Sequence, residues 1–497
     1  MAECFLNFIA GRWVEPTTGE YFDNRNPADW NDLIGRFPRS GPEDVRRAVE
    51  SARRGFARWS RTPAPLRGQV LQRVGQLLVE RKETIARAMT REMGKPLLET
   101  RGDVQEGIDT AFYAAGEGRR LFGRVVPSEL RRKWAMTYRR PLGVVGVITP
   151  FNFPLAVPTW KIFPALLSGN AVVWKPSEDV PHTANLLAEV LLEAGLPPDV
   201  FHVVHGFGET VGKALVEHPD VAAISFTGST ETGSKVGEAC GRLHKRVSLE
   251  MGGKNAMIVM DDADLELALD GVLWGAFGTT GQRCTATSRL ILHARIHDGF
   301  LDRVCERAAR LRLGPGLEPE TEVGPLIHQA ARDKVERYVE LARQEGARVV
   351  LGGATPTDPR LAGGWFYPPT VFAGVRPGTR VEQEEIFGPA LAVIRVESLD
   401  EAIAVNNDVR YGLSSALYTR DVAAAFRAME ELDNGITYIN APTIGAEAHL
   451  PFGGVKQTGN GHREGGWEVY DFFTETKTLY VDFSGTLQRA QIDTYAQ

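Results

Sequence analysis

One cysteine and one glutamate of this chain have the surroundings that a two-step acyl chemistry requires. Cys284 follows a glycine-containing segment that is expected to run from a loop into a helix, and Glu250 ends a predicted strand just before a double glycine. A thiol can attack a carbonyl carbon and form a covalent intermediate, which a separate carboxylate can then release by activating water. Either segment alone would be a weak signal, but together they predict covalent catalysis.

Cys284 differs from the other cysteines in its neighbours. A single cysteine is more often a small buried apolar residue than a nucleophile. Arg283 is adjacent, however, and an adjacent cation is expected to lower the pKa of the thiol and raise its thiolate fraction. Cys240 and Cys305 lie within helical patterns, and Cys4 has no comparable motif. We therefore expect Cys284 to be the nucleophile.

Glu250 and Asn152 each allow a structural and a catalytic interpretation. Glu250 could be a surface charge at a strand end, but the glycines after it indicate close approach of a ligand or another segment. A carboxylate in a partly apolar cleft can have a raised pKa and act as a base near neutral pH. Asn152, at a strand-to-helix turn, could cap the following helix, donate a side-chain N–H to an oxyanion, or do both.

The central part of the sequence alternates between short apolar strands and amphipathic helices. This pattern predicts a parallel sheet covered on both faces, in the doubly wound arrangement. Ligands of such sheets lie at the carboxyl ends of the strands. We expect strands at residues 143–149, 171–175, 200–205, 222–227 and 246–251, and helices at 154–167, 183–194, 209–218 and 231–240.

Two of these strand ends carry residues that could bind a dinucleotide. Lys175 and Glu178 follow one strand, where an acidic residue could bind ribose hydroxyls and repel a 2′-phosphate, although either could equally be a solvated charge. Phe226, Gly228 and Ser229 form another strand-to-helix turn, whose helix N-terminus could hold a pyrophosphate. The second signal is weak because the turn is not GxGxxG.

The flanking regions predict further units of the fold. A strand-like opening at 8–14 precedes helices at 44–59, 65–93 and 100–121, and the charge-rich, alternating segment 123–141 predicts a hairpin arm. A second α/β unit begins near residue 257. Its strands are expected at 257–259, 290–293, 348–351, 390–396, 416–418 and 436–439, with helices that include 300–311 and 333–344, before a last strand at 478–483.

Composition excludes several classes of protein. The chain has 497 residues, 43% of them hydrophobic and 24% charged, as in a globular protein with a large core. The net charge of −6 does not favour a nucleic-acid-binding protein, because such proteins usually carry an excess of basic residues. The four cysteines show no CxxC spacing, so we expect no metal site, no disulfide framework and reduced thiols in the cytoplasm. We find no signal peptide and no transmembrane stretch.

The chain resembles the aldehyde dehydrogenase superfamily over essentially its whole length. The resemblance rests on segments that occur in the family's order: Pro150-Phe151-Asn152-Phe153-Pro154, Trp174-Lys175-Pro176-Ser177-Glu178, Phe226-Thr227-Gly228-Ser229, Leu249-Glu250-Met251-Gly252-Gly253-Lys254, Gly281-Gln282-Arg283-Cys284, Glu384-Glu385-Ile386-Phe387-Gly388-Pro389 and Leu450-Pro451-Phe452-Gly453-Gly454. It implies a Rossmann-type cofactor domain (1–122 and 142–252), an α/β catalytic domain (253–452) and a small β oligomerisation arm with a C-terminal tail (123–141 and 470–497).

The resemblance also implies roles for individual residues. Cys284 attacks the aldehyde, the Asn152 amide and the Cys284 backbone N–H hold the oxyanion, and Glu250 activates water to hydrolyse the thioester. Lys161 matches a lysine near this general base. The implied cofactor-binding residues are Thr149, Pro150, Lys175, Ser177, Glu178, Phe226, Gly228, Ser229, Glu385 and Phe387, and those of the substrate tunnel are Phe153, Trp160, Arg283, Glu447 and Phe452.

Finally, the resemblance implies NAD as cofactor, with NADP as the alternative, and a homodimer or homotetramer. Arg283 and the segment before Leu450 are similar to the branch that oxidises amino-acid-derived semialdehydes such as α-aminoadipic semialdehyde; simple aliphatic aldehydes are the alternative substrates. A CoA-acylating semialdehyde dehydrogenase would share the fold and the cysteine but would not need Glu250. A non-catalytic binding protein on this scaffold would be expected to lose Cys284 or Glu250, and neither is lost.

Overall fold

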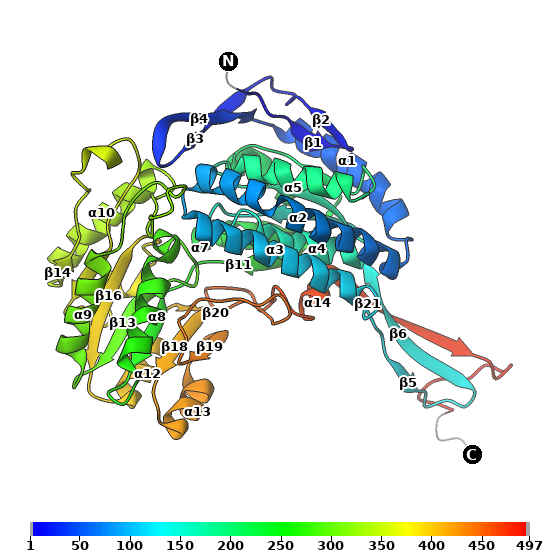
Figure 1. Ribbon diagram of the computed structural model, residues 1–497. Helices are drawn as coiled ribbons and strands as arrows, with labels where there is room; N and C mark the ends of the chain where they lie inside the picture. Colours follow the sequence, from blue (N-terminus) through cyan, green and yellow to red (C-terminus); the bar gives the residue numbers. More distant parts are fainter. Residues whose placement is uncertain (1–2, 494–497) are drawn as a thin grey trace.

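Two seven-stranded sheets form the framework of the molecule, whose computed structural model describes residues 3–493 (Figure 1). In the first sheet, five neighbouring strands are parallel and two antiparallel strands extend one edge. Its order is β11 (Arg246–Glu250), β10 (Val221–Thr227), β7 (Val144–Ile148), β8 (Ala171–Lys175), β9 (Phe201–Val203), β1 (Asn7–Ile9) and β2 (Arg12–Val14).

Helices cover both faces of this sheet because successive side chains of its strands point in opposite directions. Val145 and Val147 of β7 pack into one apolar core, whereas Val144 and Ile148 pack into another. The first core is closed by α2 (Ala64–Met93), α3 (Leu97–Glu117), α4 (Ala156–Ser168), α5 (Pro181–Glu193) and α14 (Val469–Phe473), and the second by α1 (Pro42–Trp59), α6 (Lys213–Glu217) and α7 (Thr230–Arg242).

The second sheet repeats this arrangement with different strands. All its neighbouring pairs are parallel except the one at the β14 edge. Its order is β14 (Arg348–Leu351), β15 (Thr370–Ala373), β16 (Ala390–Val396), β13 (Thr287–His293), β12 (Asn255–Val259), β18 (Ser414–Tyr418) and β19 (Ile436–Ile439). Its helices are α8 (Leu265–Phe277), α9 (His297–Ala309), α10 (Gln329–Gln344), α11 (Arg380–Gln383), α12 (Leu399–Asn407) and α13 (Val422–Glu431).

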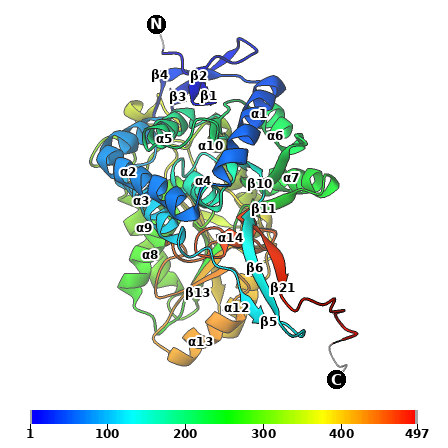
Figure 2. The same cartoon turned by 90° about the vertical axis from the view of Figure 1, so that its right-hand side faces the viewer.

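A three-stranded sheet extends from the body as an arm (Figures 1 and 2). It joins segments far apart in the sequence, in the order β21 (Thr474–Asp482), β6 (Lys133–Pro141) and β5 (Val125–Pro127). The hairpin predicted at 123–141 is therefore present. The last strand begins at Thr474, four residues before its predicted start, because its whole length pairs with β6.

The structure corrects several details of the predicted elements. The opening strand is a tight hairpin, since Ala10 and Gly11 both have positive φ, 55° and 71°. The sequence analysis missed the hairpin of β3 (Tyr21–Asn26) and β4 (Asp29–Pro38), the strand β15 and the short pair β17 (Tyr411–Gly412) and β20 (Val455–Lys456). The helix predicted at 209–218 is split into a π-helical turn, η1 (Gly208–Gly212), and α6.

The predicted α/β class is confirmed, whereas the functional division into domains stays a prediction. Between residues 3 and 493, no helix is long and apolar enough to cross a membrane.

Candidate active site

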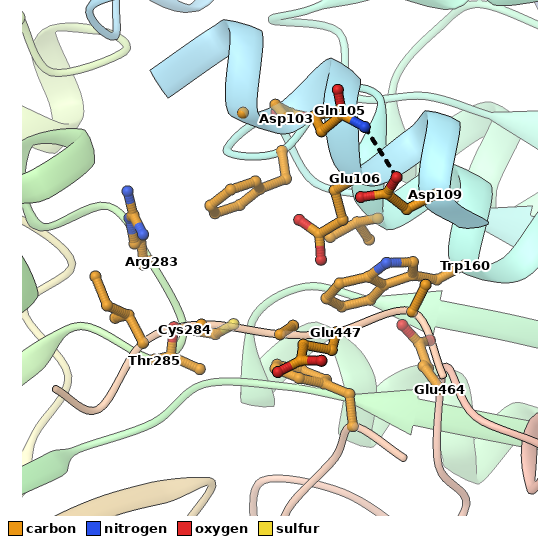
Figure 3. A pocket seen from close by; sticks show the side chains of 18 of the residues that line it. Asp103, Gln105, Glu106, Asp109, Trp160, Arg283, Cys284, Thr285, Glu447 and Glu464 are labelled. Carbon is orange, nitrogen blue, oxygen red and sulfur yellow. Dashed lines mark hydrogen bonds between the residues drawn. The ribbon is translucent and has the colours of Figure 1, made fainter. Parts of the chain in front are cut away.

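Cys284 and Glu250 line one cavity of about 720 Å³. Its walls come from α3, from the start of α4, from the loop before β13 and from the chain between β19 and β20 (Figure 3). All five residues predicted for the substrate tunnel lie on these walls: Phe153, Trp160, Arg283, Glu447 and Phe452. The segments that were predicted to form the active site are far apart in the sequence, and they meet at this cavity.

The chain before Cys284 follows an unusual backbone path that Glu99 of α3 stabilises. Thr279 and Thr280, in the short turn η2 (Gly278–Gly281), have positive φ angles of 53° and 58°. The Glu99 carboxylate accepts a hydrogen bond of 2.9 Å from the Thr279 N–H and pairs with the Arg283 guanidinium at 2.6 Å. Such a conformation is unfavourable for a β-branched residue and persists only where surrounding contacts hold it.

Two further contacts position the Cys284 backbone. A Cβ atom at Gly281 would lie 2.1 Å from the Gly388 carbonyl oxygen, so only glycine fits at this close approach. The Asn255 side-chain amide donates a hydrogen bond of 2.7 Å to the Cys284 carbonyl. The nucleophile loop is thus held on both sides of the thiol.

The expectation that Arg283 lowers the pKa of the Cys284 thiol is wrong. Burial raises this pKa to about 12, and the negative charges of Glu385 and Glu250 act in the same direction. The Arg283 guanidinium pairs with Glu99 and lies over the Trp274 ring, 4.8 Å from its centroid. Its charge is therefore compensated by Glu99, although the residue is next to the cysteine in sequence.

Glu250 is a buried carboxyl group with an unpaired oxygen. It ends β11, is 3% exposed, and its Oε1 atom has no hydrogen-bond partner among the described residues. Burial raises the pKa of this carboxyl well above its usual range, and the Glu464 carboxylate adds to the effect while Lys161 and Arg463 oppose it. The predicted raised pKa of Glu250 is confirmed in direction.

Lys161 lies beside Glu250 as predicted, but its partner is a residue that sequence analysis missed. Its ammonium group forms an ion pair with Glu464 and donates a hydrogen bond of 3.2 Å to the Ser225 hydroxyl. Glu464 is 2% exposed and lines the cavity. The only sequence signal for it was the glycine-rich segment 459–466, which lets the chain pass close to the end of β11.

Asn152 is buried, and it is not the cap of the following helix. That helix, α4, begins at Ala156, whose N–H donates to the Asp103 carboxylate at 2.7 Å. The backbone carbonyl of Asn152 accepts a hydrogen bond of 3.0 Å from Lys95, which is itself fully buried and paired with Asp103 at 2.7 Å. A buried ion pair therefore ties the Asn152 loop to α3, and of the two predicted roles the oxyanion donor is the one that stays a prediction.

The residues predicted to bind the adenosine half of a dinucleotide lie at the carboxyl ends of β7, β8 and β10. Lys175 and Glu178 form an ion pair of 2.7 Å. Ser229 caps α7, because its hydroxyl accepts from the Thr232 N–H at 3.2 Å. The other members of this group are Thr149, Pro150, Ser177, Phe226 and Gly228.

Glu385 and Phe387 lie between α11 and β16 of the second sheet and contact the chain that follows β11 and β7 of the first. The Gly253 N–H donates to Glu385 at 2.9 Å, and a Cβ at Gly252 would lie 2.4 Å from the other Glu385 oxygen. Phe387 has a φ of 60°, and its ring meets the edge of Phe151 at 5.9 Å. The double glycine is needed for this approach, as the sequence predicted.

Comparisons with known proteins agree with this geometry. The model of the aldehyde dehydrogenase family matches residues 13–479. An alpha-ketoglutaric semialdehyde dehydrogenase of Bacillus subtilis (strain 168) is 42% identical over 96% of this chain and 98% of its own length. An alpha-ketoglutarate semialdehyde dehydrogenase of Haloferax volcanii is 40% identical over 97% of this chain and 100% of its own length.

A solved structure shows the same architecture. The betaine aldehyde dehydrogenase of Staphylococcus aureus, in complex with NAD+, superimposes with a TM-score of 0.95 at 35% sequence identity, covering 97% of this chain and 96% of that one. The fold, the site residues and the whole-length similarity lead to one conclusion: the chain belongs to the aldehyde dehydrogenase family.

Proposed function

We propose that this protein oxidises the aldehyde group of a small semialdehyde to a carboxylate, with NAD as the hydride acceptor. The observation that carries the proposal is the meeting of Cys284 and Glu250 in one cavity of an aldehyde dehydrogenase fold. Glu250 ends a strand of the first sheet and Cys284 lies in the loop before β13 of the second, so their convergence is a property of the tertiary structure and not of local sequence.

In this proposal Cys284 is the nucleophile. After the thiol has lost its proton to solvent, the Sγ thiolate adds to the aldehyde carbon and the carbonyl π bond breaks. The resulting oxyanion would be held by the Asn152 side-chain amide and the Cys284 backbone N–H. The protein holds a thiohemiacetal before the hydride leaves and a thioester afterwards. The fixed backbone on both sides of Cys284 supports this role, because small displacements of a reacting atom reduce the rate strongly.

Glu250 then acts as the general base for water. A carboxyl group with a raised pKa accepts a proton more readily than an ordinary one and suits a base that operates near neutral pH. The unpaired Oε1 atom of Glu250 is free to meet water that enters the cavity. Lys161 and Glu464 lie beside it as an ion pair and compensate each other's charge.

The residues at the strand ends fit NAD. The N-terminus of α7 offers backbone N–H groups for a pyrophosphate, and the buried Thr227 hydroxyl has no partner among the described residues. Lys175 and Glu178 would hold the adenosine ribose, and Glu385 the nicotinamide ribose. When bound, the nicotinamide supplies the hydride acceptor. NADP is the alternative, since Lys175 could compensate a 2′-phosphate.

The relatives' names point to an oxo-acid semialdehyde as substrate. Two relatives that align over nearly their whole length are named for α-ketoglutarate semialdehyde, a substrate with a carboxylate and no ammonium group. We therefore propose that substrate in place of α-aminoadipic semialdehyde. Glu447, predicted to line the substrate tunnel, is largely exposed at the cavity wall, and its carboxylate lies 3.6 Å from the His449 ring nitrogen.

We also propose a cytoplasmic homodimer or dimer of dimers. β21 and β5 form the edges of the arm sheet, and the exposed side chains of this region include Trp134, Tyr480 and Phe483. Exposed edge strands and large apolar groups are typical of surfaces that bind another protein chain. The four free cysteines support a reducing compartment.

The pKa of Cys284 has a direct consequence for its alkylation. Because the thiol pKa is raised to about 12, the reactive thiolate is a small fraction at neutral pH and grows with pH. We expect the rate of Cys284 labelling by iodoacetamide in the cofactor-free protein to rise about tenfold per pH unit between about pH 7 and pH 10. Peptide mass spectrometry separates Cys284 from the other cysteines. A plateau below pH 9 would show a thiolate already formed.

Substitution of the base should separate the two halves of the reaction. Glu250→Gln is expected to slow steady-state turnover about 100-fold, because hydrolysis of the thioester becomes slow. NADH should still form in a first burst of about one per active site. Stopped-flow absorbance measures both phases. Cys284→Ala, the matched control, should show neither burst nor turnover. If Glu250→Gln lost the burst as well, Glu250 would act before hydride transfer.

Cofactor choice should depend on Glu178. We expect NAD to be preferred, and Glu178→Gln to raise kcat/KM for NADP about tenfold, because the variant removes a like charge from the 2′-phosphate and releases Lys175. The value for NAD in the same variant serves as the control and should change less. A wild-type enzyme that favoured NADP would contradict this role.

The arm predicts an assembly that sedimentation can measure. At micromolar concentration we expect a dimer or tetramer, and we expect Trp134→Glu combined with Tyr480→Glu to shift the equilibrium toward monomer, because both side chains are exposed on the arm. A stable, active wild-type monomer would contradict the assembly.

A further inference from the structure

One carboxyl group on the cavity wall has no use in the mechanism described above. Glu106 lies on α3 and lines the cavity, and its buried Oε1 atom has no hydrogen-bond partner among the described residues. Figure 3 shows this carboxyl group directed into the cavity, on the same side as Trp160 and across from Cys284 and Glu447. Buried polar groups are almost always paired, so an unpaired one in a binding cavity indicates a group that a ligand satisfies.

Its acidic neighbours differ from it because each has a partner. Glu99 pairs with Arg283, Asp103 with Lys95 and Glu464 with Lys161. Asp109, one turn further along α3, accepts a hydrogen bond of 2.8 Å from the Gln105 amide, which Figure 3 shows as a dashed line. The charges of Glu99, Asp103 and Glu464 are therefore compensated by cations, whereas Asp109 has a neutral amide partner.

The surroundings of Glu106 favour its protonated form. Burial raises the pKa of this carboxyl to about 8, Asp103 and Asp109 raise it further, and Lys95 and Arg283 lower it. The negative charge of Glu106 helps to raise the pKa of Tyr438, and Glu447 lies across the cavity from Glu106 in Figure 3. Near pH 7 the group is mainly a neutral acid that can donate an O–H and does not repel an anion.

We propose that Glu106 is the specificity-determining residue for the far end of the substrate: its carboxyl group donates a hydrogen bond to the carboxylate or 2-oxo oxygen of the oxo-acid semialdehyde held at Cys284. This inference rests on the proposed function and adds the group that recognises the substrate. A neutral donor at this position would suit an acidic substrate, because the charges of Glu99, Asp103 and Glu464 are already compensated by Arg or Lys partners. An ionised Glu106 would instead select an ammonium group, as in an ω-aminoaldehyde.

Two substitutions separate these roles. Glu106→Ala removes the donor, and we expect kcat/KM for α-ketoglutarate semialdehyde to fall at least about tenfold while that for pentanal, of equal length but without a polar end, changes less than about twofold. Glu106→Gln keeps a neutral donor and should retain most of the activity. Glu80→Gln, on the exposed part of α2, controls for the loss of a glutamate. Equal losses for both substrates, a Gln variant as impaired as the Ala variant, or a wild type that prefers 4-aminobutanal to the semialdehyde would overturn the proposal.

The pH profile gives an independent readout. As pH rises through about 8, Glu106 loses its proton and repels the anionic substrate, so wild-type kcat/KM for the semialdehyde should fall relative to that for pentanal. The ratio should stay flat in Glu106→Gln. A flat ratio in the wild type would contradict a neutral-acid donor.

A binding experiment distinguishes failure of this inference from failure of the proposed function. In Cys284→Ala, which has no nucleophile, calorimetry with 2-oxoglutarate measures recognition of the polar end alone. We expect Glu106→Ala in this background to weaken binding about tenfold and Glu106→Gln to change it less than about threefold. Unchanged binding in Glu106→Ala overturns the inference, whereas weakened binding beside an absent dehydrogenase activity overturns only the proposed reaction.

Discussion

The site depends on one crossing of the chain between the two sheets. β11 ends the first sheet at Glu250, and β12 begins the second at Asn255. The double glycine between them is packed on both sides, because a Cβ at Gly252 would meet Glu385 at 2.4 Å and one at Gly253 would meet the Cys284 carbonyl oxygen at 2.4 Å. Glu250, the proposed base, thus lies just before the crossing, and Asn255, which holds the Cys284 carbonyl, lies just after it. The absence of two side chains at Gly252 and Gly253 lets the chain pass close to Glu385 and Cys284.

Helix α3 supplies the second constraint. Glu99 and Asp103 are four residues apart and so lie on the same face of this helix. Glu99 holds the turn before Cys284, and Asp103, with Lys95, holds the loop that carries Asn152. Removing one member of a buried ion pair leaves an uncompensated charge, so each pair strongly disfavours displacement of its loop. Helix α3 therefore holds both the loop of Cys284, the proposed nucleophile, and the loop of Asn152, the predicted oxyanion donor.

The sequence predicted the site best where a residue is identified by its immediate neighbours in the chain. Glu250 could be placed at a strand end before two glycines because an apolar run and a glycine pair are both short-range signals, and the structure confirms that position. The Cys284 thiol was the opposite case. Its neighbour Arg283 was predicted to activate the thiol by its positive charge. Adjacency in sequence does not determine the direction of a side chain, however, and the Arg283 guanidinium pairs with Glu99, more than 180 residues away.

The site residues that were not predicted from the sequence share one property: their importance depends on contacts with residues distant in the chain. Glu464, Lys95 and Glu106 carry no motif, and on a helix or loop a charged residue is most simply a solvated one. Only the packed structure shows that Glu464, Lys95 and the Oε1 atom of Glu106 are buried, and which charges lie near them.

The ion pairs between distant residues also determine the net charge of the cavity walls. A count of charged residues on its walls gives a strongly acidic tunnel, which would favour cationic aldehydes. Pairing changes this balance, because Lys95, Lys161 and Arg283 each compensate one carboxylate and burial favours the neutral form of Glu106. The same burial raises the pKa of Cys284 and of Glu250. Ion pairing and burial thus reduce the negative charge that the cavity presents to the proposed anionic substrate, and the same burial raises the pKa of Glu250 and keeps the Cys284 thiol protonated at neutral pH.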